Sequence, residues 1–91
     1  MALTREQALK QARGDAAART GVSESDVKEV SVENTEFPDM ALGAATRGEM
    51  SGMMMTSGWR FLLSANGKSL EYRANPDQVR LFGYQGKNYR L

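Results

Sequence analysis

The sequence contains neither cysteine nor histidine. Without cysteine there is no disulfide framework, no thiol nucleophile and no thiolate ligand for a metal. Without histidine, the commonest general base and the usual ligands of transition metals are missing as well. We therefore expect no catalytic residue, no metal site and no cofactor.

The sequence also lacks an excess of charge of either sign, and it lacks long apolar runs. The 91 residues include 12 Lys and Arg against 11 Asp and Glu, so no overall basic field favours nucleic acid or a membrane. No apolar run approaches the roughly 20 residues that span a bilayer, and the N-terminal residues lack the apolar core of a signal peptide. We expect one cytoplasmic domain without a membrane partner, while the earlier removal of a leader stays open.

Residues 4–20 carry the signals of a helix. Thr4 is a natural N-cap, Gln7 completes a capping box, and Gly21 is the expected left-handed C-cap. The apolar stripe of this helix is mostly alanine, which indicates close packing against a sheet. Gly14 inside the helix costs about 1 kcal/mol relative to alanine. A close approach of the sheet to the helix at this position would explain why glycine is tolerated there.

An Asn66-Gly67 pair lies between two segments of alternating apolar residues. This pattern predicts a β-hairpin over residues 58–74 with a type I′ turn, because both central positions of that turn need positive φ. The turn fixes the register, which places Phe61 opposite Tyr72 on the core face.

Further strands are predicted on both sides of this hairpin. Residues 28–37 read as a strand in which Val30 and Val32 point inward, and residues 78–83 read as the last strand. Residues 84–91 read as a fraying tail. The predicted class is α+β, with one N-terminal helix packed across an antiparallel sheet of about four strands, a helix followed by a β-meander.

Short motifs of aromatic, glycine and acidic residues are spread along most of the chain. They are Phe37-Pro38-Asp39, Leu42-Gly43, Gly48-Glu49-Met50, Gly58-Trp59-Arg60, Asn66-Gly67 and Leu70-Glu71-Tyr72-Arg73. This pattern resembles a small bacterial domain of unknown function. Ala44 and Arg73 stand where that family often has Cys and His, so the resemblance implies the fold and not redox or metal chemistry.

The order of a helix followed by a meander also resembles the cystatin-like fold and the smaller PepSY domains. Those families bind or inhibit peptidases. The cystatin inhibitory motif Gln-x-Val-x-Gly has no match in this sequence. This second resemblance therefore concerns topology alone and implies no functional residue.

A Met-rich segment, residues 39–57, contains Met50, Met53, Met54 and Met55. One interpretation is a partner-binding loop, because methionines form adaptable contact surfaces. A second interpretation is a core or edge strand in which Met53 and Met55 face inward and Met54 faces outward. A metal site is disfavoured, because thioethers alone bind chiefly soft ions.

The predicted registers also place Arg60, Arg73 and Arg80 side by side on the solvent face of the sheet. Directly opposed like charges are destabilising unless an anion lies between them, so one interpretation of this arginine row is a site for a small anion or an acidic protein. The alternative is a solvated charge lattice in which Glu71 and the glutamates of the first strand neutralise the row. Nucleic acid is disfavoured, because no stacking aromatic residues are interleaved.

These patterns favour a non-enzymatic protein- or peptide-interaction domain. The expected contact surface is the Met-rich segment with the adjacent sheet edge, where an open sheet can pair with a peptide or with a second copy as a homodimer. The alternative function is an anion or nucleic-acid binder that uses the arginine row.

Overall fold

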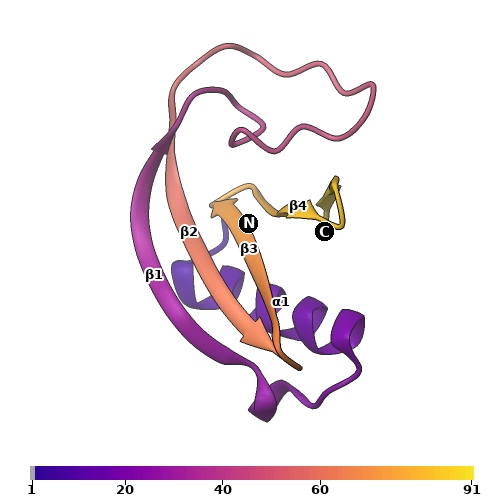
Figure 1. Ribbon diagram of the computed structural model, residues 1–91. Coiled ribbons are helices and arrows are strands. Elements are labelled where there is room, and N and C mark those ends of the chain that lie inside the picture. Colours follow the sequence, from indigo (N-terminus) through magenta and orange to yellow (C-terminus); the bar gives the residue numbers. More distant parts are fainter. Residues whose placement is uncertain (1) are drawn as a thin grey trace.

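The computed structural model describes residues 2–91, which form an α+β domain (Figure 1). Within these residues the elements are α1 (Arg5–Thr20), the short 3₁₀ helix η1 (Glu24–Asp26), β1 (Lys28–Phe37), β2 (Thr56–Ala65), β3 (Lys68–Asn75), β4 (Gln78–Tyr84) and β5 (Lys87–Arg90). The strands lie in the sheet in chain order, each antiparallel to the next. The predicted class is confirmed, with five strands in the described residues instead of about four.

The caps of α1 follow the sequence prediction. The Thr4 hydroxyl accepts a hydrogen bond from the Gln7 amide (3.1 Å), and the Thr4 amide donates to the Gln7 side chain (2.9 Å). Gly21 ends the helix with φ of +76°. The residues that face the sheet are the fully buried alanines Ala8, Ala12 and Ala16. Their small side chains let the helix lie close to the strands.

The β2–β3 hairpin has the predicted turn and register. Asn66 and Gly67 have φ of +52° and +73°, the left-handed values that a type I′ turn requires. Phe61 lies opposite Tyr72 on the face that α1 covers. One row of core side chains crosses all five strands in register: Val32, Phe61, Tyr72, Leu81 and Tyr89.

The C-terminal residues 84–91 do not form a fraying tail, so that prediction is wrong. Most of them complete a hairpin with β4, and its last strand is held against the helix. The Arg19 guanidinium lies 4.2 Å from the centre of the Tyr89 ring, an attractive cation–π contact. The Asp15 carboxylate accepts from both Arg19 (2.6 Å) and the Tyr72 hydroxyl (2.7 Å). Burial and the hydrogen bond to Asp15 raise the pKa of Tyr72.

Val30 does not point inward, which corrects a second prediction. The pairing of β1 with β2 passes from Glu29 to Ser31, so Val30 is the extra residue of a β-bulge. Its side chain is 59% exposed. Val32, beyond the bulge, keeps its predicted inward position.

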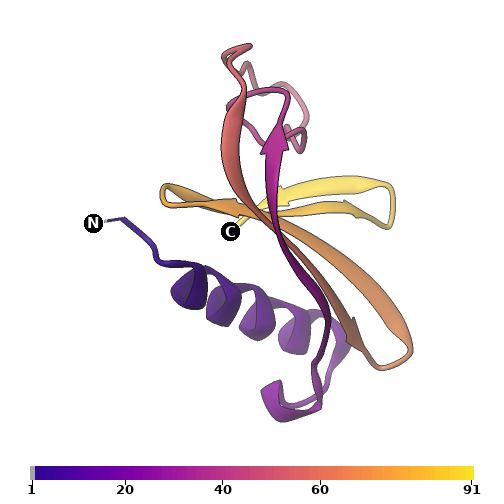
Figure 2. The same cartoon turned by 90° about the vertical axis from the view of Figure 1, so that its left-hand side faces the viewer.

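Residues 38–55, hereafter the connecting loop, join β1 to β2. The loop extends from the end of these strands over β4 and β5 (Figure 1), on the side opposite α1 (Figure 2). Several apolar residues of this region are buried apart from the helix-side core: Phe37, Ala41, Leu42 and Ala44. The sheet is therefore covered by a helix on one face and partly by a loop on the other.

Candidate functional site

The first part of the connecting loop, residues 38–49 and hereafter the first half-loop, is built around Asp39; residues 50–55 form the second half-loop. Its side chain accepts hydrogen bonds from the amides of Ala41 (2.9 Å) and Gly43 (3.0 Å), an arrangement typical of Asx turns. Leu42 and Gly43 both have positive φ, +60° and +67°. A Cβ at position 43 would lie 2.6 Å from the Arg73 guanidinium, so this position needs glycine both for its backbone and for the space.

Backbone carbonyls of this half-loop bind side chains of the sheet. The donor and acceptor pairs are Gln78 to Met40 (2.7 Å), Arg73 to Leu42 (3.1 Å), Arg80 to Ala44 (3.3 Å) and Asn88 to Ala45 (2.8 Å). The donors come from β3, β4 and β5. Because buried carbonyls need partners, these bonds fix the path of the half-loop across the sheet.

Arg80 makes the strongest of the contacts between loop and sheet. Its two terminal nitrogens donate to the two carboxylate oxygens of Glu49, each at 2.6 Å, which is the bidentate geometry of a strong ion pair. The Arg80 side chain is only 2% exposed. The hydrogen bonds from Arg80 and from the Thr46 amide lower the pKa of Glu49 to about 2.

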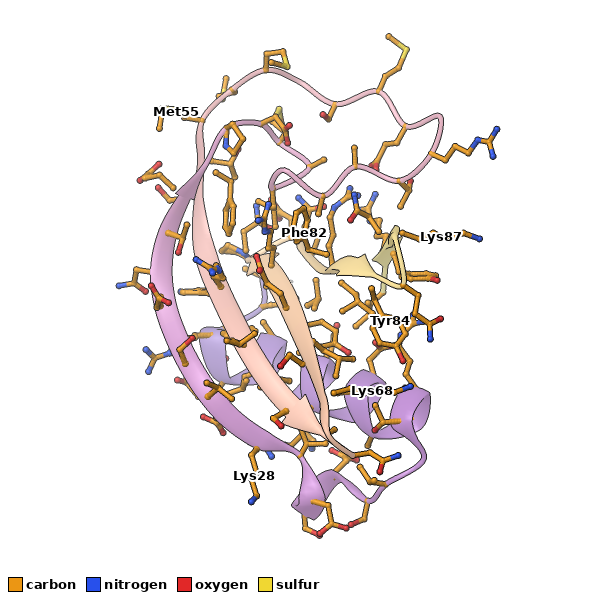
Figure 3. All side chains as sticks on the ribbon, in the orientation of Figure 1. Lys28, Met55, Lys68, Phe82, Tyr84 and Lys87 are labelled. Atoms are coloured by element: carbon orange, nitrogen blue, oxygen red, sulfur yellow. The ribbon has the colours of Figure 1, made fainter. Side chains whose placement is uncertain are left out.

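Arg73 lies between aromatic rings under the same loop. Its guanidinium is 3.6 Å from the centre of the Phe82 ring and 5.5 Å from that of Phe37. Figure 3 shows Phe82 beneath the connecting loop. The Arg73 Nε also donates to Glu71 (2.9 Å), and Glu71 forms a second ion pair with Arg60 at 3.3 Å.

The arginine row exists as the registers predicted. The predicted exposure is wrong for Arg73 and Arg80, whose side chains are 18% and 2% exposed, whereas the Arg60 side chain is 41% exposed. Arg60 lies opposite Arg73, Arg73 opposite Arg80, and Arg80 opposite Arg90 at the edge strand. Arg80 is buried because the connecting loop lies over it. Glu71 was the predicted neutralising residue, whereas Glu49 takes the place that the first-strand glutamates were expected to fill. The row binds carboxylates of its own chain.

Four of the five methionines of the connecting loop lie in its second half and point into solvent. The exposed fractions are 96% for Met50, 86% for Met53, 65% for Met54 and 68% for Met55. We call these four residues the methionine surface. Figure 3 shows Met55 at the outer side of the loop, just before β2. Residues 51–55 belong to no strand, so the interpretation as a core or edge strand is wrong.

Few bonds hold this second half-loop. The Met40 amide donates to the Gly52 carbonyl (2.9 Å), and the Thr56 hydroxyl donates to the Met54 carbonyl (2.9 Å). A Cβ on Gly52 would lie 2.6 Å from the Met40 sulfur, so Met40 packs directly on this glycine. The methionine surface therefore extends from a base that the first half-loop anchors.

Sequence reasoning missed the residues that anchor the loop. Asp39, Leu42 and Glu49 make the contacts described above, and all three belong to the short motifs of aromatic, glycine and acidic residues in the sequence. The spacing of these three residues in the sequence matches neither the period of a helix nor that of a strand, so periodicity did not reveal them. The available signal was the glycines spaced along this segment, Gly43, Gly48 and Gly52, which mark turns and loops.

Among residues 2–91, no helix combines the length and the apolar character needed to cross a bilayer. In the same part of the chain, no group of three or more acidic side chains is arranged to hold a metal ion.

Comparison with known proteins identifies the family. No curated protein and no solved structure gives a significant match to this chain. A family model described as a domain of unknown function, DUF8738, matches residues 9–82. The match begins inside α1, includes the whole connecting loop and ends in β4. Because it covers well over half of the sequence, the chain belongs to the DUF8738 family.

Proposed function

We propose that this domain is a non-enzymatic protein-interaction module and that the methionine surface is its contact site. The observation that carries the proposal is the exposure of four methionines within six consecutive positions, residues 50–55. Contiguous exposed apolar side chains mark interaction sites on soluble proteins. Methionine suits such a site, because its unbranched, polarizable side chain adapts to different partner shapes.

The anchored base of the loop supports this proposal. A loop ordered only by its partner would lose conformational entropy on binding. Here the Arg80–Glu49 pair and the Asp39 turn already hold the first half-loop, so much of that cost is met within the fold. The partner would then order chiefly the side chains of the methionine surface.

The test replaces Met53, Met54 and Met55 together with glutamine. These exposed positions should change the free energy of unfolding by less than about 0.5 kcal/mol each. Capture of partners from an extract of the producing cells should fall at least about tenfold, as expected when central interface residues are removed. The matched control is Val30→Gln, which removes an exposed apolar side chain elsewhere and should leave capture unchanged.

Salt distinguishes this proposal from the alternative of an anion or nucleic-acid binder. Binding through the methionine surface should persist as salt is raised, whereas binding through arginines should weaken steeply. An anion at the arginine row would first have to displace Glu71 or Glu49. Retained capture by the glutamine variant, or equal loss in the Val30 control, would contradict the proposed contact site.

A peptidase-inhibitor role rests only on the element order, one helix followed by an antiparallel meander. The methionine surface gives no further support to that role. The proposal of an interaction module therefore stands on the loop and not on the topology.

A further inference from the structure

β1 is an edge strand with an open outer side. In the sheet of residues 2–91 it pairs only with β2. α1 packs chiefly on β2, β3 and β4, and its Arg13 guanidinium pairs with Glu29 of β1. The part of β1 that is left open is its outer backbone edge. Unpaired backbone groups along such an edge can receive an added strand.

The usable length of this edge is set by the bulge. The irregular pairing at Val30 interrupts the strand, and regular pairing then runs from Ser31 to Phe37. This stretch presents two exposed carboxylates, Glu33 and Glu36, and no basic residue. Its charge therefore favours an added strand that carries a positive side chain and disfavours a second copy of the same edge.

A pocket of about 470 Å³ lies beside the same stretch. Its lining consists of Asn34, Thr35, Glu36, Ser57, Gly58, Trp59 and Pro76. Trp59 is half-buried and pairs with Asn34 across the two strands. Glu36 accepts a hydrogen bond from the Ser57 hydroxyl (2.6 Å), which leaves its second oxygen for another donor.

We propose that β1 binds an extended peptide segment of a partner by strand addition, with an arginine or lysine of that segment in the Trp59 pocket. An indole face attracts a cation, and the Glu36 carboxylate supplies the complementary charge. Backbone pairing along 31–37 supplies the affinity, and the pocket selects the side chain. The inference extends the proposed function, since both make the domain a binding module, but it uses a surface separate from the methionine surface.

The first experiment selects a random seven-residue peptide library, displayed on phage, against the whole domain. The recovered peptides should be enriched in arginine or lysine, with β-branched residues at alternating positions. No enrichment of basic residues over the starting library would overturn the proposal, as would recovery of acidic peptides.

The second experiment measures binding of the most enriched peptide by the fluorescence of Trp59, the only tryptophan of the chain. Glu36→Gln should weaken binding about tenfold or more, and the control Glu24→Gln should leave it unchanged. A peptide methylated at alternate backbone nitrogens should lose binding, because strand addition needs those N–H groups. Binding that survives either the Glu36 change or the methylation would contradict the proposal.

Hydrogen exchange keeps the two proposals separate. The bound peptide should slow amide exchange between Ser31 and Phe37, where alternate amides gain partners. The variant with glutamine at Met53, Met54 and Met55 should bind this peptide with unchanged affinity, even if the methionine surface proves to have no partner. Loss of peptide binding in that variant would place the peptide on the methionine surface and overturn the inference.

Discussion

Gly67 is the single residue on which the central hairpin most depends. Its φ of +73° is one that a β-branched side chain strongly resists. Gly67→Val should therefore lower the free energy of unfolding by about 1–3 kcal/mol, measured by urea denaturation. No atom of another segment lies within 4 Å of the place a Cβ would take, so the loss would come from the backbone alone. An unchanged midpoint would contradict the type I′ turn.

Gly14, in contrast to Gly67, is a glycine whose replacement should stabilise the domain. It lies inside α1, and the nearest atoms to an added Cβ belong to the Glu24 carboxylate, at 3.9 Å and 4.0 Å. The close approach that would explain a helix glycine is therefore absent at this position. Gly14→Ala should raise the free energy of unfolding by about 0.5–1 kcal/mol. A lower denaturation midpoint for this variant would show that the helix needs the glycine.

Glu49 should make the stability of the domain sensitive to acid. Its pKa lies near 2 in the folded protein and near 4.5 without its partners. A lowered pKa contributes stability in full above the unfolded value, and that contribution is lost as the pH falls from about 4.5 towards 2. Thermal unfolding should show this loss in the wild type, and Glu49→Gln should flatten the slope in that window. An equal slope in both proteins would show that the Arg80 pair does not hold Glu49 ionised.

At the scale of elements, the sequence predicted those parts that local rules govern. The capping box of α1 and the Asn66-Gly67 turn are each specified by residues within a few positions of one another, so their geometry follows from short motifs. The bulge at Val30 and the pairing of the last strand depend on contacts across the sheet. Strand alternation alone does not predict them.

The conformation of the connecting loop could not be predicted from such short motifs, because it depends on contacts between residues far apart in the sequence. Glu49 and Arg80 are 31 positions apart, and no periodic pattern joins them. The sequence did identify the arginine row and its need for an anion. The anion was then found within the chain, in Glu71 and Glu49. The exposure of the Met-rich segment did not follow from the sequence, because alternation of Met53 and Met55 also fits a strand.

Arg80 gives a prediction at this scale. Arg80→Gln removes the bidentate partner of Glu49, and loss of one member of a buried pair costs roughly 3–5 kcal/mol. Amide exchange should speed up in the loop, at Met40, Leu42 and Ala44, more than in α1. The matched control is Arg60→Gln, a half-exposed residue whose single ion pair should be worth less than about 1 kcal/mol. Equal effects of the two changes would contradict the anchoring role of Arg80.

At the scale of the whole molecule, the two faces of the sheet are covered in different ways. α1 and the aligned core row make one face a closely packed apolar core. The other face holds the connecting loop through charged and carbonyl contacts and carries the methionine surface beyond the sheet. The open edge of β1 lies at the side of the sheet, between its two faces.

Oxidative footprinting of the methionines tests the proposed contact site most directly. Peroxide converts accessible methionine to its sulfoxide, and mass spectrometry reports the rate at each position. In the isolated domain, Met50, Met53, Met54 and Met55 should oxidise nearly as fast as free methionine. In an extract of the producing cells, the rates at these four positions should fall, whereas the oxidation rate of free methionine added to the same extract sets the reference. Slow oxidation of the isolated domain, or unchanged rates in the extract, would contradict an exposed methionine surface that binds a partner.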